Sequence, residues 1–125
     1  MAKRVLIADD EEDVKDVMRM FLETRGYEVE TAYDGLDALD RVKAWRPDVV
    51  LLDIMMPVVD GIQVCKTIKA DEATKKIPVI MVSAASKREK EGVAYEAGAE
   101  AYVLKPFDPE ELARVVEKCL AGETV

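Results

Sequence analysis

Short apolar segments alternate with segments of helical periodicity along the chain, and this alternation constrains the fold more than any other feature of the sequence. Residues 5–8, 49–52 and 79–82 are apolar throughout, as expected for strands that are buried on both faces of a sheet. A further apolar run ends at Leu104. A polar turn and a helical segment follow each run, which indicates repeated strand–helix units and a parallel sheet covered by helices on both faces.

The second strand has a different pattern. Tyr27, Val29 and Thr31 alternate with Glu28 and Glu30, which is typical of a strand at the exposed edge of a sheet. With this strand at one edge, the most economical strand order is 2-1-3-4-5. The sequence therefore predicts an α/β fold of the flavodoxin-like (βα)5 type, with five parallel strands and helices on both faces.

Apolar residues that recur every three or four positions predict the helices. The first helix contains Val14, Val17, Met18, Phe21 and Leu22 and stops at Gly26, and the last contains Leu112, Val115, Val116, Cys119 and Leu120 after an Asp108-Pro109 start. Leu36, Leu39 and Val42 mark the second helix, and Ile62, Cys65 and Ile68 mark the third. The fourth, over residues 87–97, has the thinnest apolar stripe, made of Val93, Ala94 and Ala97.

Size and charge limit the function classes. The 125 residues suffice for one domain, which we expect to span residues 1–125. A net charge of −8, from 26 acidic and 18 basic residues, argues against direct nucleic-acid binding. No apolar run exceeds four residues, which argues against a membrane span and a secretory signal. Cys65 and Cys119 lie in apolar patterns without metal-ligand spacing, so we interpret them as buried thiols of a cytoplasmic protein.

The chain contains no histidine. This absence excludes Ser-His-Asp and Cys-His nucleophile systems and the usual zinc enzymes. It also means that this chain cannot itself carry a phosphohistidine. Chemistry here must use carboxylates, hydroxyls, lysine or a metal.

Polar side chains follow four of the predicted strands at the point where each strand ends. Asp9 and Asp10 follow the first strand, Asp53 the third, Ser83 the fourth and Lys105 the fifth. Ligands of open parallel sheets bind beyond the carboxyl ends of the strands, next to the point where the strand order reverses. That reversal falls between strands one and three, so the topology gathers these side chains at one edge.

Each of these residues also has an ordinary structural interpretation. Acids in the first turn of a helix complement its dipole, and we prefer that interpretation for residues 11–13. Asp53 and Ser83 are each acceptable as caps, and Lys105 is acceptable as a surface lysine. These interpretations account for the residues one by one and not for their convergence.

Three carboxylates at contact distance repel one another unless a cation or protons intervene. Oxygen ligands without sulfur or imidazole indicate Mg²⁺ or its relative Mn²⁺. A carboxylate nucleophile, a lysine and a hydroxyl stand beside this cluster. The set is suited to phosphoryl transfer to a carboxylate.

Four strings in the sequence carry a resemblance to a known family. They are Leu6-Ile7-Ala8-Asp9-Asp10-Glu11, Leu52-Asp53-Ile54-Met55-Met56-Pro57 with Asp60-Gly61, Val82-Ser83-Ala84, and Lys105-Pro106-Phe107. In order and spacing they resemble the receiver domain of two-component response regulators, of the chemotaxis-regulator type. The likeness covers residues 3 to 121 approximately.

The resemblance implies a role for each acid. Asp53 accepts a phosphoryl group from the phosphohistidine of a sensor kinase or phosphotransfer protein. Asp10 and Asp53 bind Mg²⁺ directly, together with the backbone carbonyl of Met55, and Asp9 assists largely through water. Such a protein is a signalling module and not an enzyme with a separate substrate, because it catalyses only its own phosphotransfer and slow autodephosphorylation.

The resemblance also implies how the signal leaves the site. Lys105 pairs with the phosphoryl group, Ser83 donates a hydrogen bond to it, and Tyr102 is the aromatic switch residue. The surface of the fourth helix, fifth strand and fifth helix then binds a downstream effector, with the chain as a monomer or a phosphorylation-dependent dimer. The Lys105–Pro106 peptide bond is expected to be cis.

Three alternatives stay open at this stage. A haloacid-dehalogenase-type enzyme also forms an aspartyl phosphate, but its Asp-x-Asp pattern and cap domain are missing here. A flavodoxin-like electron carrier shares the topology, but its phosphate loop needs hydroxyls and backbone amides in place of the acids at residues 9–13. The third alternative is that the chain is the receiver half of a longer response regulator with a DNA-binding or enzymatic output domain.

Overall fold

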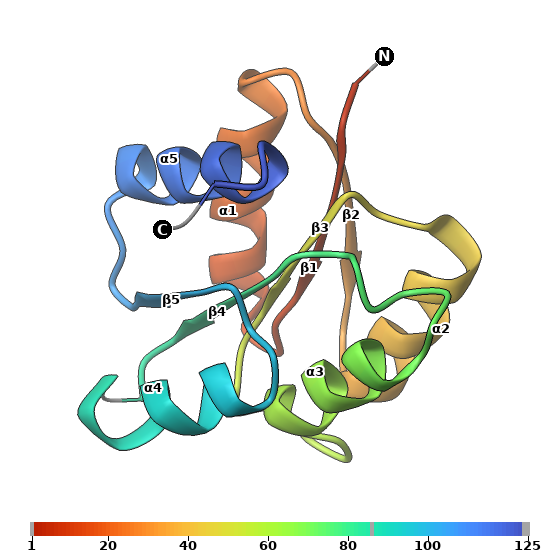
Figure 1. Ribbon diagram of the computed structural model, residues 1–125. Helices are drawn as coiled ribbons and strands as arrows, with labels where there is room; N and C mark the ends of the chain where they lie inside the picture. Colours follow the sequence, from red (N-terminus) through yellow and green to blue (C-terminus); the bar gives the residue numbers. More distant parts are fainter. Residues whose placement is uncertain (1, 86, 124–125) are drawn as a thin grey trace.

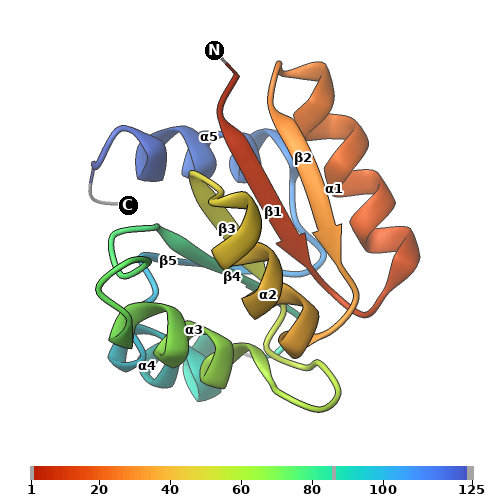
Figure 2. The same cartoon turned by 90° about the vertical axis from the view of Figure 1, so that its right-hand side faces the viewer.

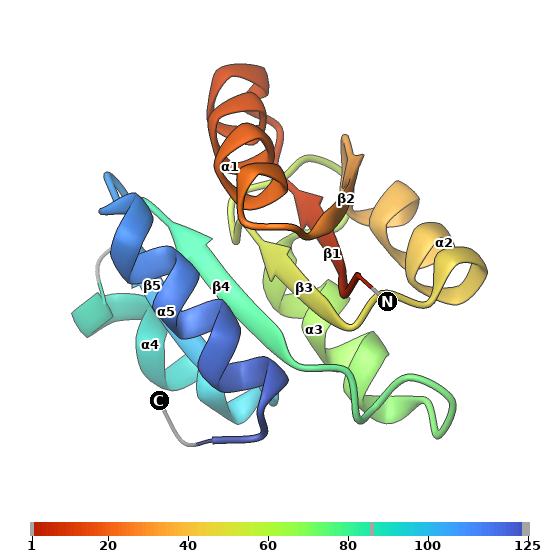
Figure 3. The ribbon, with the colours of Figure 1, turned by 90° about the horizontal axis from the view of Figure 1, so that it is seen from above.

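The computed structural model describes residues 2–85 and 87–123 and contains the predicted sheet (Figure 1). Its strands are β1 (Arg4–Ala8), β2 (Glu28–Ala32), β3 (Val49–Leu52), β4 (Val79–Ser83) and β5 (Ala101–Leu104). Neighbouring strands pair in parallel in the order β2-β1-β3-β4-β5, which can be followed across Figure 3. The predicted fold class and strand order are confirmed. The domain expected over residues 1–125 includes positions 1, 86, 124 and 125, which lie outside the described residues.

The helices are α1 (Glu12–Thr24), α2 (Gly35–Trp45), α3 (Gly61–Ala70), α4 (Lys87–Glu96) and α5 (Pro109–Leu120). Helices α1 and α5 cover one face of the sheet, and α2, α3 and α4 cover the other (Figures 1 and 2). Each face of the sheet has its own hydrophobic core, and successive residues of β1 point into the two cores alternately. Val5 and Ile7 pack under α1 and α5, and Leu6 and Ala8 pack under the other three helices. This arrangement requires a continuous apolar run, and residues 5–8 of β1 provide it.

Aspartates fix where three of the helices begin. Asp34 accepts the N–H of Asp37 at 2.8 Å at the start of α2. Asp60 accepts the N–H of Gln63 at 2.9 Å at the start of α3, and Asp108 accepts the N–H of Glu110 at 3.0 Å at the start of α5. Each cap satisfies a backbone donor that has no partner within its helix.

Three residues of the predicted apolar stripes lie exposed on their helices. Val17 is 53% exposed, Leu36 51% and Val93 43%. In each helix a neighbouring residue takes the central position: Met18 in α1, Ala38 in α2 and Ala94 in α4. The small side chains of the last two allow a close approach to the sheet, which moves the larger residue to the margin of the contact.

Both cysteines are buried, as predicted. Burial raises the pKa of the Cys65 and Cys119 thiols to about 11, so both stay protonated near neutral pH. Among the helices of the described residues, none has the length and apolar character needed to span a membrane.

Candidate functional site

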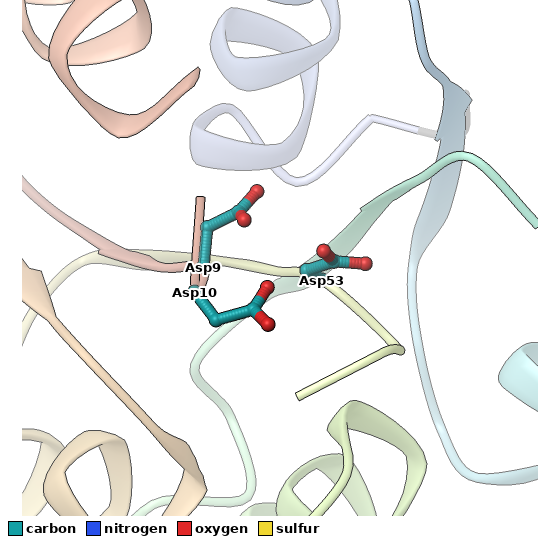
Figure 4. Close-up of side chains that lie close together, drawn as sticks. All are labelled: Asp9, Asp10 and Asp53. Carbon is teal, nitrogen blue, oxygen red and sulfur yellow. The ribbon is translucent and has the colours of Figure 1, made fainter. Parts of the chain in front are cut away.

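Three carboxylates meet at the carboxyl edge of the sheet, as the sequence predicted. Asp9 and Asp10 follow β1, and Asp53 follows β3, the strand that pairs with β1. Their side chains lie together (Figure 4), and each offers an oxygen within 4.8 Å of the others. Asp9 and Asp53 are buried, whereas Asp10 is exposed. The cluster therefore concentrates negative charge while one of its members still faces solvent.

Lys105, the residue after β5, supplies the counter-charge. Its ammonium donates to Asp9 Oδ2 at 2.7 Å, to Glu11 Oε1 at 3.0 Å and to Asp53 Oδ2 at 3.2 Å. Burial alone lowers the pKa of Lys105, but the hydrogen bonds to Asp9 and Glu11 and the attraction of Asp53 outweigh burial and raise it. The ammonium therefore stays charged at any pH at which the protein works.

Burial dominates the behaviour of Asp9. It raises the pKa of this carboxyl above its usual value of 3.8, against the opposing hydrogen bonds from the Lys105 ammonium and from the Glu11 N–H, which lies 2.9 Å from Oδ1. The charge of Asp53 raises the pKa of Asp9 further. The Lys105 ammonium thus does not fully offset the loss of water around Asp9, and a second cation is favoured beside this carboxylate.

The backbone holds Asp53 in one orientation. Its N–H donates to the carbonyl of Ala8 at 2.9 Å, which continues the pairing of β1 and β3 past the ends of the strands. One carboxylate oxygen accepts the N–H of Met55 at 3.1 Å, and the other faces Lys105. This is a fixed carboxylate with a cation beside it, as a nucleophile in phosphoryl transfer requires.

The loop after Asp53 turns back on itself at Gly61. The N–H of Gly61 donates to the carbonyl of Ile54 at 2.9 Å, and a Cβ at this position would collide with the backbone carbonyl of Asp53. We expect Gly61→Ala to lower the free energy of unfolding by about 3 kcal/mol, because backbone yields less easily than a side chain. Urea denaturation measures this effect.

Gly92 in α4 provides the matched control. A Cβ there meets nothing within 4 Å, so Gly92→Ala should raise the free energy of unfolding by about 0.5–1 kcal/mol through helix propensity alone. Equal stabilities for the two variants would contradict the tight return of the loop at Gly61.

Ser83 and Tyr102 meet at one residue of the loop that follows β4. The Ser83 hydroxyl oxygen accepts the N–H of Ala85 at 3.2 Å, and the Tyr102 hydroxyl donates to the carbonyl of the same residue at 2.7 Å. Ser83 is buried completely, and Tyr102 is 5% exposed. Burial raises the pKa of Tyr102. The residues predicted to sense the phosphoryl group are therefore connected through Ala85.

Sequence reasoning missed the part that Glu11 plays. We interpreted it as an acid of a helix start, but its side chain bonds to Lys105. The one available signal was its position directly after Asp9-Asp10. Glu12 keeps a structural role, since it pairs at 2.9 Å with the buried Lys15 of α1. The Lys105–Pro106 peptide bond is cis, as the resemblance implied.

The fold and this edge define a class: a doubly wound α/β module with an acid cluster, a lysine and a buried serine at its switch point. The chain matches the family model for the response regulator receiver domain over residues 5–117. It is 41% identical over 113 residues to the DNA-binding dual master transcriptional regulator RpaA of Synechocystis, in a match that covers 90% of this chain and 47% of that protein.

Solved structures agree with this match. A putative response regulator from Chloroflexus aurantiacus superposes with a TM-score of 0.93 at 34% identity, covering 97% of this chain and 99% of that one. The chemotaxis response regulator CheY4 of Vibrio cholerae gives 0.89 at 32% identity, covering 95% and 99%. This chain belongs to the response regulator receiver family, which decides against the dehalogenase and flavodoxin alternatives.

Proposed function

We propose that this receiver domain accepts a phosphoryl group on Asp53 from the phosphohistidine of a sensor kinase or phosphotransfer protein. The observation that carries the proposal is the Asp53 carboxylate, oriented by Met55 and lying 3.2 Å from the Lys105 ammonium at the edge of the sheet. A carboxylate oxygen attacks phosphorus, the bond from phosphorus to the donor breaks, and the leaving group keeps the bonding electrons. The donor histidine belongs to a partner, since this chain has none.

The direct test uses a small phosphodonor. Acetyl phosphate with Mg²⁺ should add one phosphoryl group to the chain, and peptide mapping should place it on Asp53. Intact-mass spectrometry measures the addition. A chain that stays unmodified, or that carries the group on another residue, contradicts the proposal.

The residues around Asp53 fit Mg²⁺, or Mn²⁺ in its place. Asp9, Asp10 and Asp53 offer carboxylate oxygens within 4.8 Å of one another, and sulfur and imidazole are absent from the set. We assign direct contacts to Asp10, Asp53 and the backbone carbonyl of Met55, and a contact largely through water to Asp9. A bound cation of this kind offsets the negative charge of the carboxylate and of the incoming phosphoryl oxygens.

Mg²⁺ should stabilise the fold. Because the cation binds the folded chain, a concentration a hundredfold above its dissociation constant raises the free energy of unfolding by about 2.7 kcal/mol. Asp10→Ala should remove this response and should leave the metal-free chain no less stable, since repulsion within the cluster falls. Thermal denaturation with and without Mg²⁺ measures both effects.

Asp40→Ala is the control, because it removes an exposed acid of α2 and changes the net charge equally. It should keep the full Mg²⁺ response. If millimolar Mg²⁺ leaves the melting temperature of the original chain unchanged, the metal assignment is contradicted.

We further propose that phosphorylation is transmitted to the surface of α4, β5 and α5, which binds a downstream effector. The contacts that support this are those of Ser83 and Tyr102 with Ala85. A phosphoryl oxygen that draws the Ser83 hydroxyl away from Ala85 changes the loop to which the Tyr102 hydroxyl is bonded. One charge-assisted hydrogen bond is worth about 2 kcal/mol, enough to move a balanced equilibrium more than tenfold.

Ser83→Ala should therefore separate phosphorylation from its transmission. Beryllofluoride, a mimic of an acyl phosphate, should shift amide NMR signals from Asp53 to the residues around Tyr102 in the original chain. In Ser83→Ala we expect the shifts to stay near Asp53. Tyr102→Phe, which removes only the hydroxyl, tests the contact between Tyr102 and the carbonyl of Ala85. If the shifts spread equally far in all three proteins, this route of transmission is contradicted, even if Asp53 is the residue that accepts the phosphoryl group.

The alternative that this chain is the receiver half of a longer regulator has support of its own. The chain spans about half the length of the curated relative that it matches, and that relative is described as a DNA-binding transcriptional regulator. In either case we propose a phosphorylated signalling module of the cytoplasm that acts as a monomer or as a phosphorylation-dependent dimer. Its catalysis is limited to its own phosphotransfer and slow autodephosphorylation. Reading the gene on both sides of this sequence distinguishes the two arrangements.

A further inference from the structure

A hollow of about 540 Å³ adjoins the acid cluster, and it is distinct from the space that Lys105 borders. It is lined by Asp10, Met55 and Asp60, by apolar side chains, and by Lys90 of α4. Lys105 borders another hollow, together with Glu11 and the first turn of α1. Two lysines therefore reach the edge of the sheet from different elements and through different spaces.

The two lysines differ in what they bind. Lys105 is engaged by three carboxylates. Lys90 is half-buried and takes part in none of the ion pairs between the described residues. Among the described residues it therefore has no direct ionic partner, and its positive charge acts on whatever enters the hollow that it shares with Asp10, Met55 and Asp60.

The hollow adjoins the residue that is proposed to accept the phosphoryl group. Met55, one of its lining residues, donates its N–H to the Asp53 carboxylate, so the hollow and Asp53 share a direct neighbour. In an in-line displacement, the leaving group departs on the side of phosphorus opposite to the attacking oxygen, so it needs open space beside the acid cluster, such as this hollow.

We propose that Lys90 determines which phosphodonors this chain prefers, by favouring those whose leaving group departs as an anion. The inference rests on the proposed phosphorylation of Asp53. With an acyl phosphate, the Asp53 oxygen bonds to phosphorus while the bond from phosphorus to the carboxylate oxygen breaks, and the departing carboxylate takes the electron pair and a negative charge. With phosphoramidate, the bond from phosphorus to nitrogen breaks, and an ammonium nitrogen loses its positive charge as it leaves as ammonia.

The ammonium of Lys90 acts oppositely on these two transition states. It attracts the carboxylate on which negative charge develops, and it repels the nitrogen that is still partly positive. Such an interaction, made with one transition state and not with the other, changes the ratio of rates. Removing Lys90 should slow transfer from acetyl phosphate relative to transfer from phosphoramidate.

The experiment measures second-order rate constants for labelling of Asp53 by acetyl phosphate and by phosphoramidate, at saturating Mg²⁺ and constant ionic strength. Lys90→Met should lower the ratio of the first to the second about fivefold, the scale of one partly solvated charge interaction. Lys90→Glu reverses the charge and should lower it roughly 25-fold, the square of that effect. Lys90→Arg should keep the original ratio.

Lys43→Met is the matched control, since Lys43 is exposed in the last turn of α2. It removes the same charge and should leave the ratio unchanged. Calorimetric titration of each variant with Mg²⁺ shows whether the metal is equally loaded, independently of any phosphorylation. As a further readout, the ratio in the original chain should fall as salt screens Lys90.

Each result is decisive. A fall of the ratio in Lys90→Met and a larger fall in Lys90→Glu support the inference. An unchanged ratio, or equal slowing with both donors, overturns it and leaves the proposed function intact. A chain that takes no phosphoryl group on Asp53 from either donor overturns the proposed function and the inference with it.

Discussion

Asp53→Asn is expected to abolish labelling of this chain by acetyl phosphate. The asparagine amide has the size of the carboxylate, and its oxygen is able to accept the N–H of Met55 that Asp53 accepts at 3.1 Å. The amide lacks the charge and the nucleophilic oxygen, so no acyl phosphate forms. We expect the rate to fall by at least about 1000-fold, the scale of removing a catalytic nucleophile. Intact-mass spectrometry with Mg²⁺ present measures the loss.

Asp34→Asn is the control for this experiment. Asp34 caps α2 through the N–H of Asp37 at 2.8 Å and makes the same kind of cap away from the acid cluster. Asparagine also caps helices well, so this variant should fold and accept the phosphoryl group at the original rate. Labelling of Asp53→Asn at the rate of the original chain would show that another residue is the acceptor.

The sequence was sufficient to predict the sheet because burial on both faces leaves a strong pattern. Val5 and Ile7 face one core and Leu6 and Ala8 the other, so no polar residue is acceptable at positions 5–8 of β1. The edge strand β2 alternates in sequence, and of its residues only Ala32 is fully buried. Once the strand order is fixed, the ends of the strands bring the acids and Lys105 together without further information.

The remaining features depend on geometry that periodicity does not encode. Val17 and Val93 fit helical stripes but lie at the margins of their contacts, since the distance between helix and sheet is set by neighbours such as Ala94. The bond from Lys105 to Glu11 depends on the rotamers of two long side chains. The meeting of Ser83 and Tyr102 at Ala85 involves a backbone carbonyl and N–H, which no residue type reveals.

Replacing Lys105 with methionine should impair both phosphorylation and folding. Methionine has a similar length but no charge, so nothing on this side offsets the negative charge of the phosphoryl oxygens. We expect labelling of Asp53 by acetyl phosphate to slow about 100-fold at saturating Mg²⁺, as for the loss of one preorganised electrostatic contact. Lys118→Met removes the same charge in the last turn of α5, where Cys119 and Leu120 lie beside Lys3 and Pro78 at the opposite edge of the sheet. This variant should keep the original rate.

The stability of Lys105→Met should depend on pH in a direction that the burial of Asp9 dictates. With Lys105 absent, Asp9 and Asp53 are buried at 1% and 4% exposure without their shared partner, which costs about 3 kcal/mol of unfolding free energy at neutral pH. Burial already raises the pKa of Asp9 in the original chain, and the loss of the lysine raises it further. A carboxyl whose pKa is higher in the folded chain than in the unfolded chain takes up its proton more readily when folded. The deficit of the variant should therefore shrink as the pH falls through that raised pKa.

At alkaline pH the original chain should also lose its advantage over the variant. The raised pKa of Lys105 stabilises the fold below the pKa of an unfolded lysine, and this stabilisation is lost as the pH rises through the folded value. Urea denaturation of both proteins across this range measures the difference, and a deficit that stays constant from acid to neutral pH would contradict the pairing of Lys105 with the buried acids.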